Sequence, residues 1–171
     1  MSKNIVDFNN TNDYLPLFNS VLITDLFVIL LLNTSVIKSN VLKKWYSDFN
    51  LSAVIADVLI ILIVLIITRA TYYKVFDNYS LVNFIKLAII IQITHDVLFY
   101  VFFKNIPRGV NKIIDIFKDY ANEISYKAIL ADSGMIIMSC LISSYLVNKN
   151  TNTNIIVLVS FIYLLPYLLY N

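Results

Sequence analysis

Aspartate residues stand inside four separate apolar stretches of the sequence, at Asp25, Asp57, Asp96 and Asp132, and His95 adjoins the third of them. A carboxylate in hydrocarbon is costly, so such residues normally face the interior of a helix bundle or a water-filled cavity. Carboxyl groups in a low-dielectric setting, together with an imidazole, can exchange protons near neutral pH. The sequence therefore points to a polar site within a membrane. Two roles stay open for it: a hydrogen-bonded and ionic network that sets the register of the helices, with Lys86 or Arg69 as countercharges, or the passage of protons or cations.

Further polar and small residues share helix faces with these acids. Gln92, His95 and Asp96 follow the spacing i, i+3, i+4, which places them on one face of a helix. Asp132 aligns with Ser139, a small residue that would let two helices approach closely. The candidate polar intramembrane cluster therefore consists of Asp25, Asp57, Gln92, His95, Asp96, Asp132 and Ser139.

The composition determines which elements must position these residues. Hydrophobic residues make up 59% of the chain and charged residues only 14%, well below the roughly 25% of soluble domains, so an integral membrane protein is expected. Spanning helices need about 17 to 25 apolar residues, and no segment alternates as a barrel strand would. We predict an all-α, polytopic transmembrane helical bundle with four full-length spans and a shorter fifth, at residues 15–37, 51–68, 82–103, 129–147 and 155–170.

The remaining segments are shorter or more polar. Residues 1–14 are expected to form a polar N-terminal tail before a single transmembrane domain at residues 15–171. Residues 107–128 carry apolar side chains at steps of three and four with polar ones opposite, which predicts an amphipathic helix at the membrane interface. A turn precedes it, in which the glycine would allow a positive φ: Pro107, Arg108 and Gly109. The fifth apolar run is short and contains Pro166, so a short span, a tilted half-helix and an interfacial segment all stay open.

Basic residues are distributed unevenly over the predicted loops. With five spans, the side that holds the loop at residues 38–50 carries eight of them and the opposite side four. The positive-inside rule then places the N-terminus outside and the C-terminus in the cytosol. A helix rise of about 1.5 Å per residue puts Asp57, Asp96 and Asp132 in the cytosolic half of the bilayer and Asp25 deeper.

Residues near the two interfaces are expected to anchor the spans. Trp45 and Tyr46 fall in the inner loop, where amphipathic rings favour the headgroup layer. Arg69 and Lys86 lie near the outer interface, where long side chains extend toward the headgroups. Neither basic residue reaches the inner acids easily, so those acids are expected to be protonated, paired with His95 or hydrated.

The sequence argues against most enzyme classes. A catalytic zinc needs about three protein ligands, commonly with more than one histidine, and the chain has a single histidine. A single cysteine excludes an intramolecular disulfide, and two glycines leave no phosphate-binding loop. No extended basic surface favours nucleic acid. We therefore expect no metal, cofactor or nucleic-acid partner, and a membrane-embedded enzyme ranks third among the functions considered.

One part of the chain resembles a known group of proteins. The sequences THDVLFY (residues 94–100), IPRGVNK (106–112), FKDYA (117–121) and AILADS (128–133) resemble uncharacterised multi-pass membrane proteins of large nucleocytoplasmic DNA viruses. The resemblance covers mainly residues 94–145. It implies a virion membrane or an internal host membrane, and it implies no established activity.

Two functions from different classes are consistent with these observations. The first is a structural or scaffolding role in a membrane, which the resemblance would place in a viral or virus-modified one. The second is a small proton-linked channel or transporter that uses the intramembrane acids and His95. The expected partners are the lipid bilayer and further copies of the chain or other membrane proteins.

Overall fold

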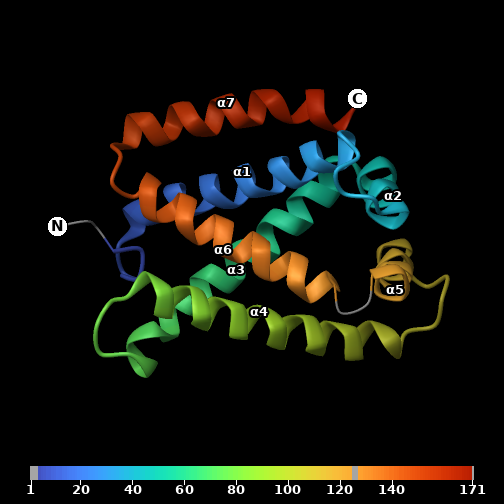
Figure 1. Ribbon diagram of the computed structural model, residues 1–171, viewed down its shortest axis with the longest axis horizontal. Coiled ribbons are helices and arrows are strands. Elements are labelled where there is room, and N and C mark those ends of the chain that lie inside the picture. The colour runs from blue at the N-terminus through green and yellow to red at the C-terminus, as the bar shows by residue number, and fades with distance from the viewer. Residues whose placement is uncertain (1–3, 125–126, 171) are drawn as a thin grey trace.

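The computed structural model describes residues 4–124 and 127–170, and over these residues the chain forms helices and no strands. The all-α prediction is thus confirmed. Figure 1 shows the elements in chain order. They are the 3-10 turn η1 (Thr11–Asp13) and the helices α1 (Tyr14–Asn33), α2 (Asn40–Phe49), α3 (Leu51–Val75), α4 (Leu81–Lys104), α5 (Lys112–Ile124), α6 (Lys127–Leu146) and α7 (Thr151–Leu169).

Five of the described helices are long and apolar enough to cross a membrane: α1 with its preceding turn, α3, α4, α6 and α7. The shortest, α7, has 19 residues, because it begins four residues before the predicted fifth span. Side chains on the outer faces of α4 and α7 are exposed and apolar, as contact with lipid requires; they include Ile90, Leu98, Phe102, Ile156 and Val159. The fold is that of a multi-pass membrane protein.

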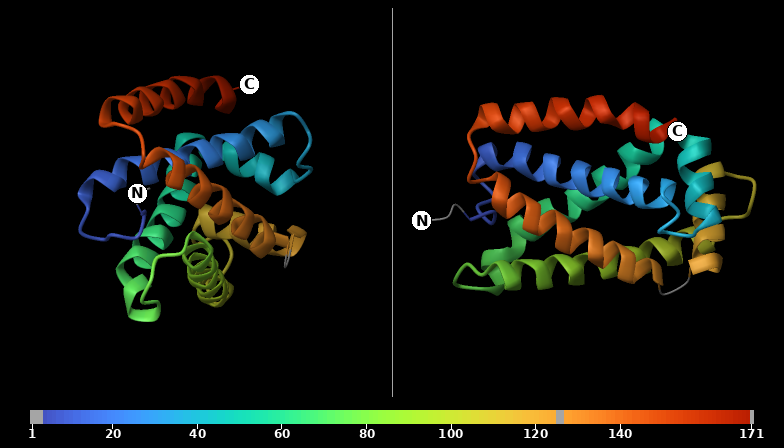
Figure 2. Two further views of the ribbon diagram at one scale, coloured as in Figure 1. Left: turned by 60° about the vertical axis from the view of Figure 1, so that its left-hand side comes forward. Right: turned by 45° about the horizontal axis from the view of Figure 1, so that its top comes forward.

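Four of these helices form a ring. α1 packs against α3 and α6, and α4 packs against the same two helices. In Figure 1 the four lie close together at the end that holds the α3–α4 and α6–α7 connections, and they spread apart toward the end where α2 and α5 lie. Figure 2 shows α7 outside this ring, alongside α1. The ring is therefore narrow at one end and wide at the other.

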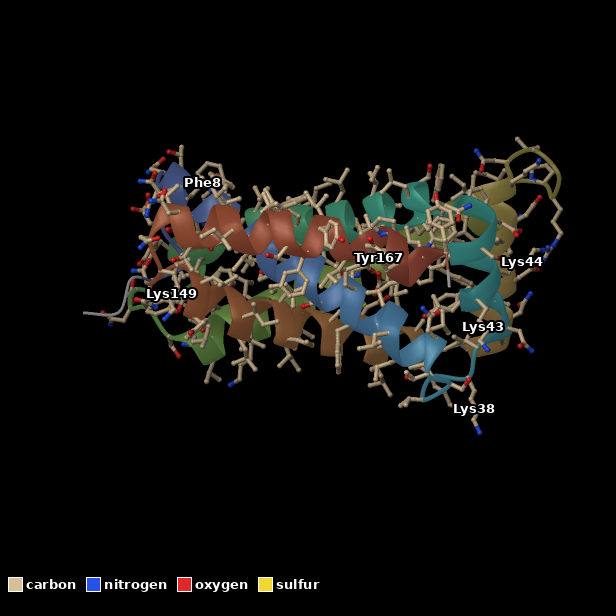
Figure 3. The ribbon with its side chains drawn as sticks, turned by 90° about the horizontal axis from the view of Figure 1, so that it is seen from above. Phe8, Lys38, Lys43, Lys44, Lys149 and Tyr167 are labelled. Atoms are coloured by element: carbon tan, nitrogen blue, oxygen red, sulfur yellow. The ribbon has the colours of Figure 1, made fainter. Side chains whose placement is uncertain are left out.

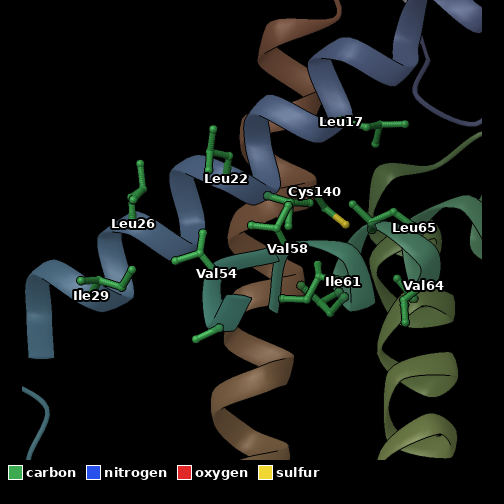
Figure 4. Packing of buried hydrophobic residues seen from close by; sticks show 14 of the residues in the cluster. Leu17, Leu22, Leu26, Ile29, Val54, Val58, Ile61, Val64, Leu65 and Cys140 are labelled. Carbon is green, nitrogen blue, oxygen red and sulfur yellow. The ribbon is translucent and has the colours of Figure 1, made fainter. Parts of the chain in front are cut away.

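Buried apolar residues on α1 and α3 lie three and four positions apart. Leu22, Leu26 and Ile29 of α1 are buried, as are Val54 and Val58 of α3, and Figure 4 labels both groups. Such spacing keeps side chains on one helix face. Each helix therefore contributes a continuous apolar stripe to the hydrophobic core that these residues share.

Amide side chains attach α7 to the ring. The Nδ2 of Asn19 in α1 donates to the backbone carbonyl of Asn154 at 2.8 Å, and the Nδ2 of Asn33 donates to the carbonyl of Leu168 at 2.7 Å. The two bonds lie at opposite ends of α7. Because lipid offers no alternative partners, interhelical hydrogen bonds of this kind hold helices together where little side-chain area is buried.

Two short amphipathic helices, α2 and α5, lie across the wide end of the ring and contact each other. α5 is the predicted amphipathic helix, shortened to Lys112–Ile124; residues 125–126 lie outside the described part. α2 is a correction, since residues 38–50 were expected to be a loop. Its Lys43 and Lys44 point outward in Figure 3, whereas Trp45 and Tyr46 are buried.

The junction between α2 and α3 explains how α2 folds back over the bundle. Only Asn50 separates the two helices, and its φ is +47°. Asparagine tolerates this left-handed region better than most residues do, because its short side chain bonds locally. Here the Asn50 Nδ2 donates to the carbonyl of Ser47 at 3.1 Å. The sharp turn places α2 against the first turns of α3.

The N-terminal segment, predicted as a polar tail, packs onto the narrow end of the bundle. Ile5 and Val6 are fully buried. The guanidinium of Arg69, in α3, donates to the carbonyl of Asp7 and, at 3.1 Å, to that of Asn10, and it lies 3.4 Å from the carboxylate of Asp13. Arg69 was expected to extend toward the headgroups, but it is 1% exposed because the chain before α1 folds over it.

Replacing Arg69 by methionine should release this segment. The carbonyls of Asp7 and Asn10 would lose a charged donor, and removing one member of a buried ionic group costs on the order of 3 kcal/mol. We expect a lower unfolding temperature in detergent and faster proteolysis before residue 14. Lys74→Met, at an exposed position of the same helix, is the matched control. Equal stability of the two variants would contradict the anchoring role.

Candidate functional site

A cavity of about 1000 Å³ occupies the wide end of the ring, between α1, α3, α4 and α6 and beneath α2 and α5. Most of its wall is apolar or aromatic. The structure brings five of the predicted cluster residues to this cavity: Asp57, Gln92, His95, Asp96 and Asp132. Three separate spans contribute one acid each, so the cavity gathers negative charge from α3, α4 and α6.

Asp25 lies outside the cavity wall but is joined to it through Tyr46. The Tyr46 hydroxyl lies 2.9 Å from Asp25 Oδ1 and 2.9 Å from Asp57 Oδ2. The indole Nε1 of Trp45 donates to the same Asp57 oxygen at 2.9 Å. Tyr46 of α2 thus connects an acid of α1 to an acid of α3, and its neighbour Trp45 adds a second donor to the α3 acid.

Counting hydrogens shows that this unit carries an additional proton. A phenol has one hydrogen and can donate to only one of two carboxylates. The phenol therefore donates to one carboxyl group, and the other has to donate a proton of its own to the phenol oxygen. We assign this proton to Asp25, because Asp25 is completely buried and its second oxygen has no partner in the described structure, whereas Asp57 also accepts from Trp45. We call Asp25, Tyr46 and Asp57 the proton-holding unit.

The phenol itself stays neutral. Burial, together with the charges at Asp57 and Asp25, raises the pKa of Tyr46 well above its ordinary value. A phenolate here would face two acids in a low-dielectric site. Tyr46 therefore keeps its hydrogen over the whole physiological pH range and bridges the two carboxyl groups.

On α4, the predicted polar face forms a second group. Gln92 Nε2 donates to Asp96 Oδ1 at 2.7 Å, and His95 Nδ1 lies 3.2 Å from the same oxygen. Within the described residues, Asp96 Oδ2 and Gln92 Oε1 are buried without a hydrogen-bond partner. Two acceptors on the cavity wall are therefore left without a donor.

Tyr120 of α5 stands among the acids from the side of the cover helices. Burial raises the pKa of this phenol, and the charges at Asp132, Asp57 and Asp96 raise it further. Its hydroxyl is therefore a permanent donor at physiological pH. Tyr120 and the acids of three spans line the same cavity below α5.

Ser139 lies away from the cavity. It is fully buried between α6 and α1, where its Oγ donates to Thr24 Oγ1 at 3.1 Å. Its small size allows the two helices to approach closely, as the sequence predicted for this face. Ser139 therefore serves helix packing and does not belong to the acid group.

The turn before α5 is also structural. Gly109 adopts φ +87°, as its position in the turn predicted, and its N–H donates to Asp115 Oδ2 at 2.9 Å. Arg108 pairs with Asp119 at 2.8 Å, and both side chains are partly exposed. The Pro107, Arg108 and Gly109 turn thus attaches the α4–α5 connection to α5 and lies outside the cavity wall.

α2 and α5 are held to each other over the cavity. The Glu123 carboxylate of α5 accepts from Ser39 Oγ at 2.6 Å and from the Val41 N–H at 3.2 Å, at the N-terminus of α2. An anion is favourable there because the helix dipole is positive. The rings of Trp45 and Phe117 pack 5.2 Å apart between the two helices. The two helices therefore form one cover over the wide end.

Sequence reasoning missed the functional part of this cover. Trp45 and Tyr46 were expected to be headgroup anchors, and Tyr120 received no role. The signal available was the amphipathic pattern of residues 40–49, which places both aromatic residues on the inward face.

Within the described ranges, no group of three or more metal-binding side chains is close enough to hold an ion.

Gly109→Ala should destabilise the cover by about 1 kcal/mol, because an L side chain is strained at this φ even though nothing crowds the position. Gly134→Ala is the control, since that glycine is helical with open space around it and should be neutral or slightly stabilising. Thermal unfolding in detergent measures both effects. Equal unfolding temperatures would argue against the strained turn.

Tyr46→Phe should remove the bridge between the two carboxyl groups. Loss of hydrogen bonds to a charged group costs about 1.5 to 3 kcal/mol, so the unfolding temperature should fall. Tyr170→Phe, at an exposed tyrosine, should leave stability unchanged. If both variants unfold at the wild-type temperature, Tyr46 does not hold the proton-holding unit together.

Comparison with known proteins gives no match, whether to a family model, a curated protein or a solved structure. A function for this chain has therefore to be inferred from its own acids, phenols and cavity.

Proposed function

We propose that the protein is a small proton-linked transporter or channel in which protons exchange at the acids of the cavity. The observation that carries this proposal is the proton-holding unit, in which Tyr46 joins a buried carboxylic acid at Asp25 to a carboxylate at Asp57. Asp57 also lines the cavity, so the unit has a route for its proton. Intramembrane acids that face a cavity are typical of proton relays.

The shape of the bundle supports transport with access in one half of its length. Phe27, Val97 and Tyr100 belong to spans, line the cavity and are 42%, 49% and 45% exposed, so the cavity opens sideways between the spans, below the cover of α2 and α5. The narrow end is closed by fully buried side chains, among them Leu65 and Phe84. A cavity that is closed toward one end of the bundle is the form that a transporter takes in one of its two states.

We propose that the wide end faces the cytosol. Figure 3 shows Lys38, Lys43 and Lys44 at that end, with Lys149 at the other. The positive-inside rule then puts the N-terminus outside and the C-terminus inside. A viral or virus-modified membrane is part of the proposal through the resemblance at residues 94–145.

A structural role in the membrane is the second candidate. It is favoured by α7, which lies outside the ring and exposes apolar side chains along its length, including Ile156, Val159 and Ile162. Such a face can pack against a second copy of the chain or against another membrane protein.

Proton flux into proteoliposomes would test the transport proposal. A pH gradient with valinomycin and potassium, read by an internal pH dye, should give flux above empty liposomes. Asp57→Asn and Asp132→Asn should each reduce it about tenfold or more, because an amide in place of the carboxyl cannot take up a proton. Two positions are tested because either variant alone could fail to fold.

Asp77→Asn is the matched control, since Asp77 is exposed in the α3–α4 connection. It should keep wild-type flux, and gel filtration should show all variants folded. Absence of flux from folded wild-type protein would overturn the transport proposal and leave the structural one.

A further inference from the structure

The cavity offers hydrogen-bond acceptors that have no donor. Gln92 is 3% exposed and lines the cavity, and its Oε1 has no partner within the described structure. Asp96 Oδ2, one helical turn away, is also buried without a hydrogen-bond partner within the described structure. A buried acceptor left unpaired costs about 1 to 3 kcal/mol, so this wall is complementary to a ligand that brings N–H donors.

The acidic side chains of the wall also favour a positively charged ligand. Asp57, Asp96 and Asp132 face the cavity from α3, α4 and α6, and the cavity-lining basic residues within the described ranges are His95 and Lys127. Lys127 is exposed at the start of α6, where its ammonium group reaches solvent. The interior therefore holds acids without a buried counter-ion, and their ionised forms favour a cation.

The rest of the wall is apolar and adaptable. Phe99 and Phe117 pack with centroids 5.2 Å apart, and Met135 and Met138 line the α6 side. Aromatic faces attract cations, and methionine side chains fit irregular apolar groups. A volume of about 1000 Å³ suits an organic ligand, since ligand pockets span roughly 300 to 1000 Å³.

We infer that the cavity binds a lipophilic amine in its protonated form, with the ammonium N–H groups donated to Asp96, Gln92 and Asp132 and the hydrocarbon part against the aromatic and methionine wall. This inference rests on the proposed function and names the compound that the protein would transport. The bare inorganic cation fits less well, because most of the wall could not replace its hydration shell.

Binding of the ammonium ion would displace protons. The acids that receive it have to be ionised, so a carboxylic acid releases its proton as the amine enters, and it regains one when the amine leaves. The groups that face this exchange are Asp57 on α3, His95 and Asp96 on α4, Tyr120 on α5, Lys127 and Asp132 on α6, and Tyr46 on α2. Amine affinity should therefore fall as the pH is lowered.

Intrinsic tryptophan fluorescence can measure such binding, because Trp45 is the single tryptophan of the chain and lines the cavity. Its fluorescence would be titrated in detergent with three probes of equal chain length: octylamine, octanol and octyltrimethylammonium. Octylamine should give a saturable change. Octanol, which lacks charge, and the quaternary ion, which lacks N–H donors, should bind about tenfold or more weakly.

Variants separate binding at this site from partition into the micelle. Asp96→Asn and Asp132→Asn should each weaken octylamine about tenfold or more, and Asp77→Asn should bind as wild type does. Equal titrations by octylamine and octanol, or unchanged affinity in both cavity variants, would overturn the inference.

The outcomes also separate this inference from the proposed function. Proton flux without octylamine binding would leave the transport proposal standing and remove the amine as cargo. Octylamine binding without proton flux would establish the ligand and overturn the channel form of the proposed function, in which protons pass without a cargo.

Discussion

The structure depends on one hydroxyl group held between two carboxyl groups. Tyr46 connects Asp25 of α1 to Asp57 of α3, and Trp45 beside it donates to the same Asp57 oxygen. The contact permits two acids to be buried near each other, because one of them carries a proton and the other accepts two hydrogen bonds. It also fixes α2 across the wide end of the ring. The contact of Tyr46 with the two acids therefore sets both the protonation of the site and the position of its cover.

Buried polar groups are paired differently at the two ends of the bundle. At the narrow end, Arg69 is paired with the carboxylate of Asp13 and with backbone carbonyls, so its charge is compensated, while its Nε and Nη1 have no hydrogen-bond partner among the described residues. At the wide end, the acids lack an equivalent buried cation among the described residues and instead use phenol, indole and amide donors. The first arrangement stabilises a fold, whereas the second leaves acceptors that a ligand or a proton can satisfy.

Much of this organisation can be predicted from the sequence, since the spans, their number and the amphipathic helix before α6 are set by local hydrophobic patterns. Gln92, His95 and Asp96 meet on α4 because their spacing alone places them on one face. The acids of different helices could be proposed as a group from their similar depth, and Asp57, Asp96 and Asp132 do line one cavity. Ser139 shared a face with Asp132, but its contact partner on α1 depended on helix packing.

The sequence by itself determined a bundle of five apolar helices and the similar depth of Asp57, Asp96 and Asp132, because length, hydropathy and helix rise are local properties. It placed Asp25 deeper, whereas the structure joins Asp25 to Asp57 through one hydroxyl group. Only the tertiary structure decided that residues 40–49 fold back as α2, which a single residue of positive φ at Asn50 permits. That turn brings Tyr46 to Asp25 and Asp57 and changes an expected headgroup anchor into part of the proton-holding unit. Arg69 is buried for a similar reason, because the segment before α1 returns to it across 56 residues or more of chain. Contacts of this kind depend on how distant segments meet, and no local pattern encodes them.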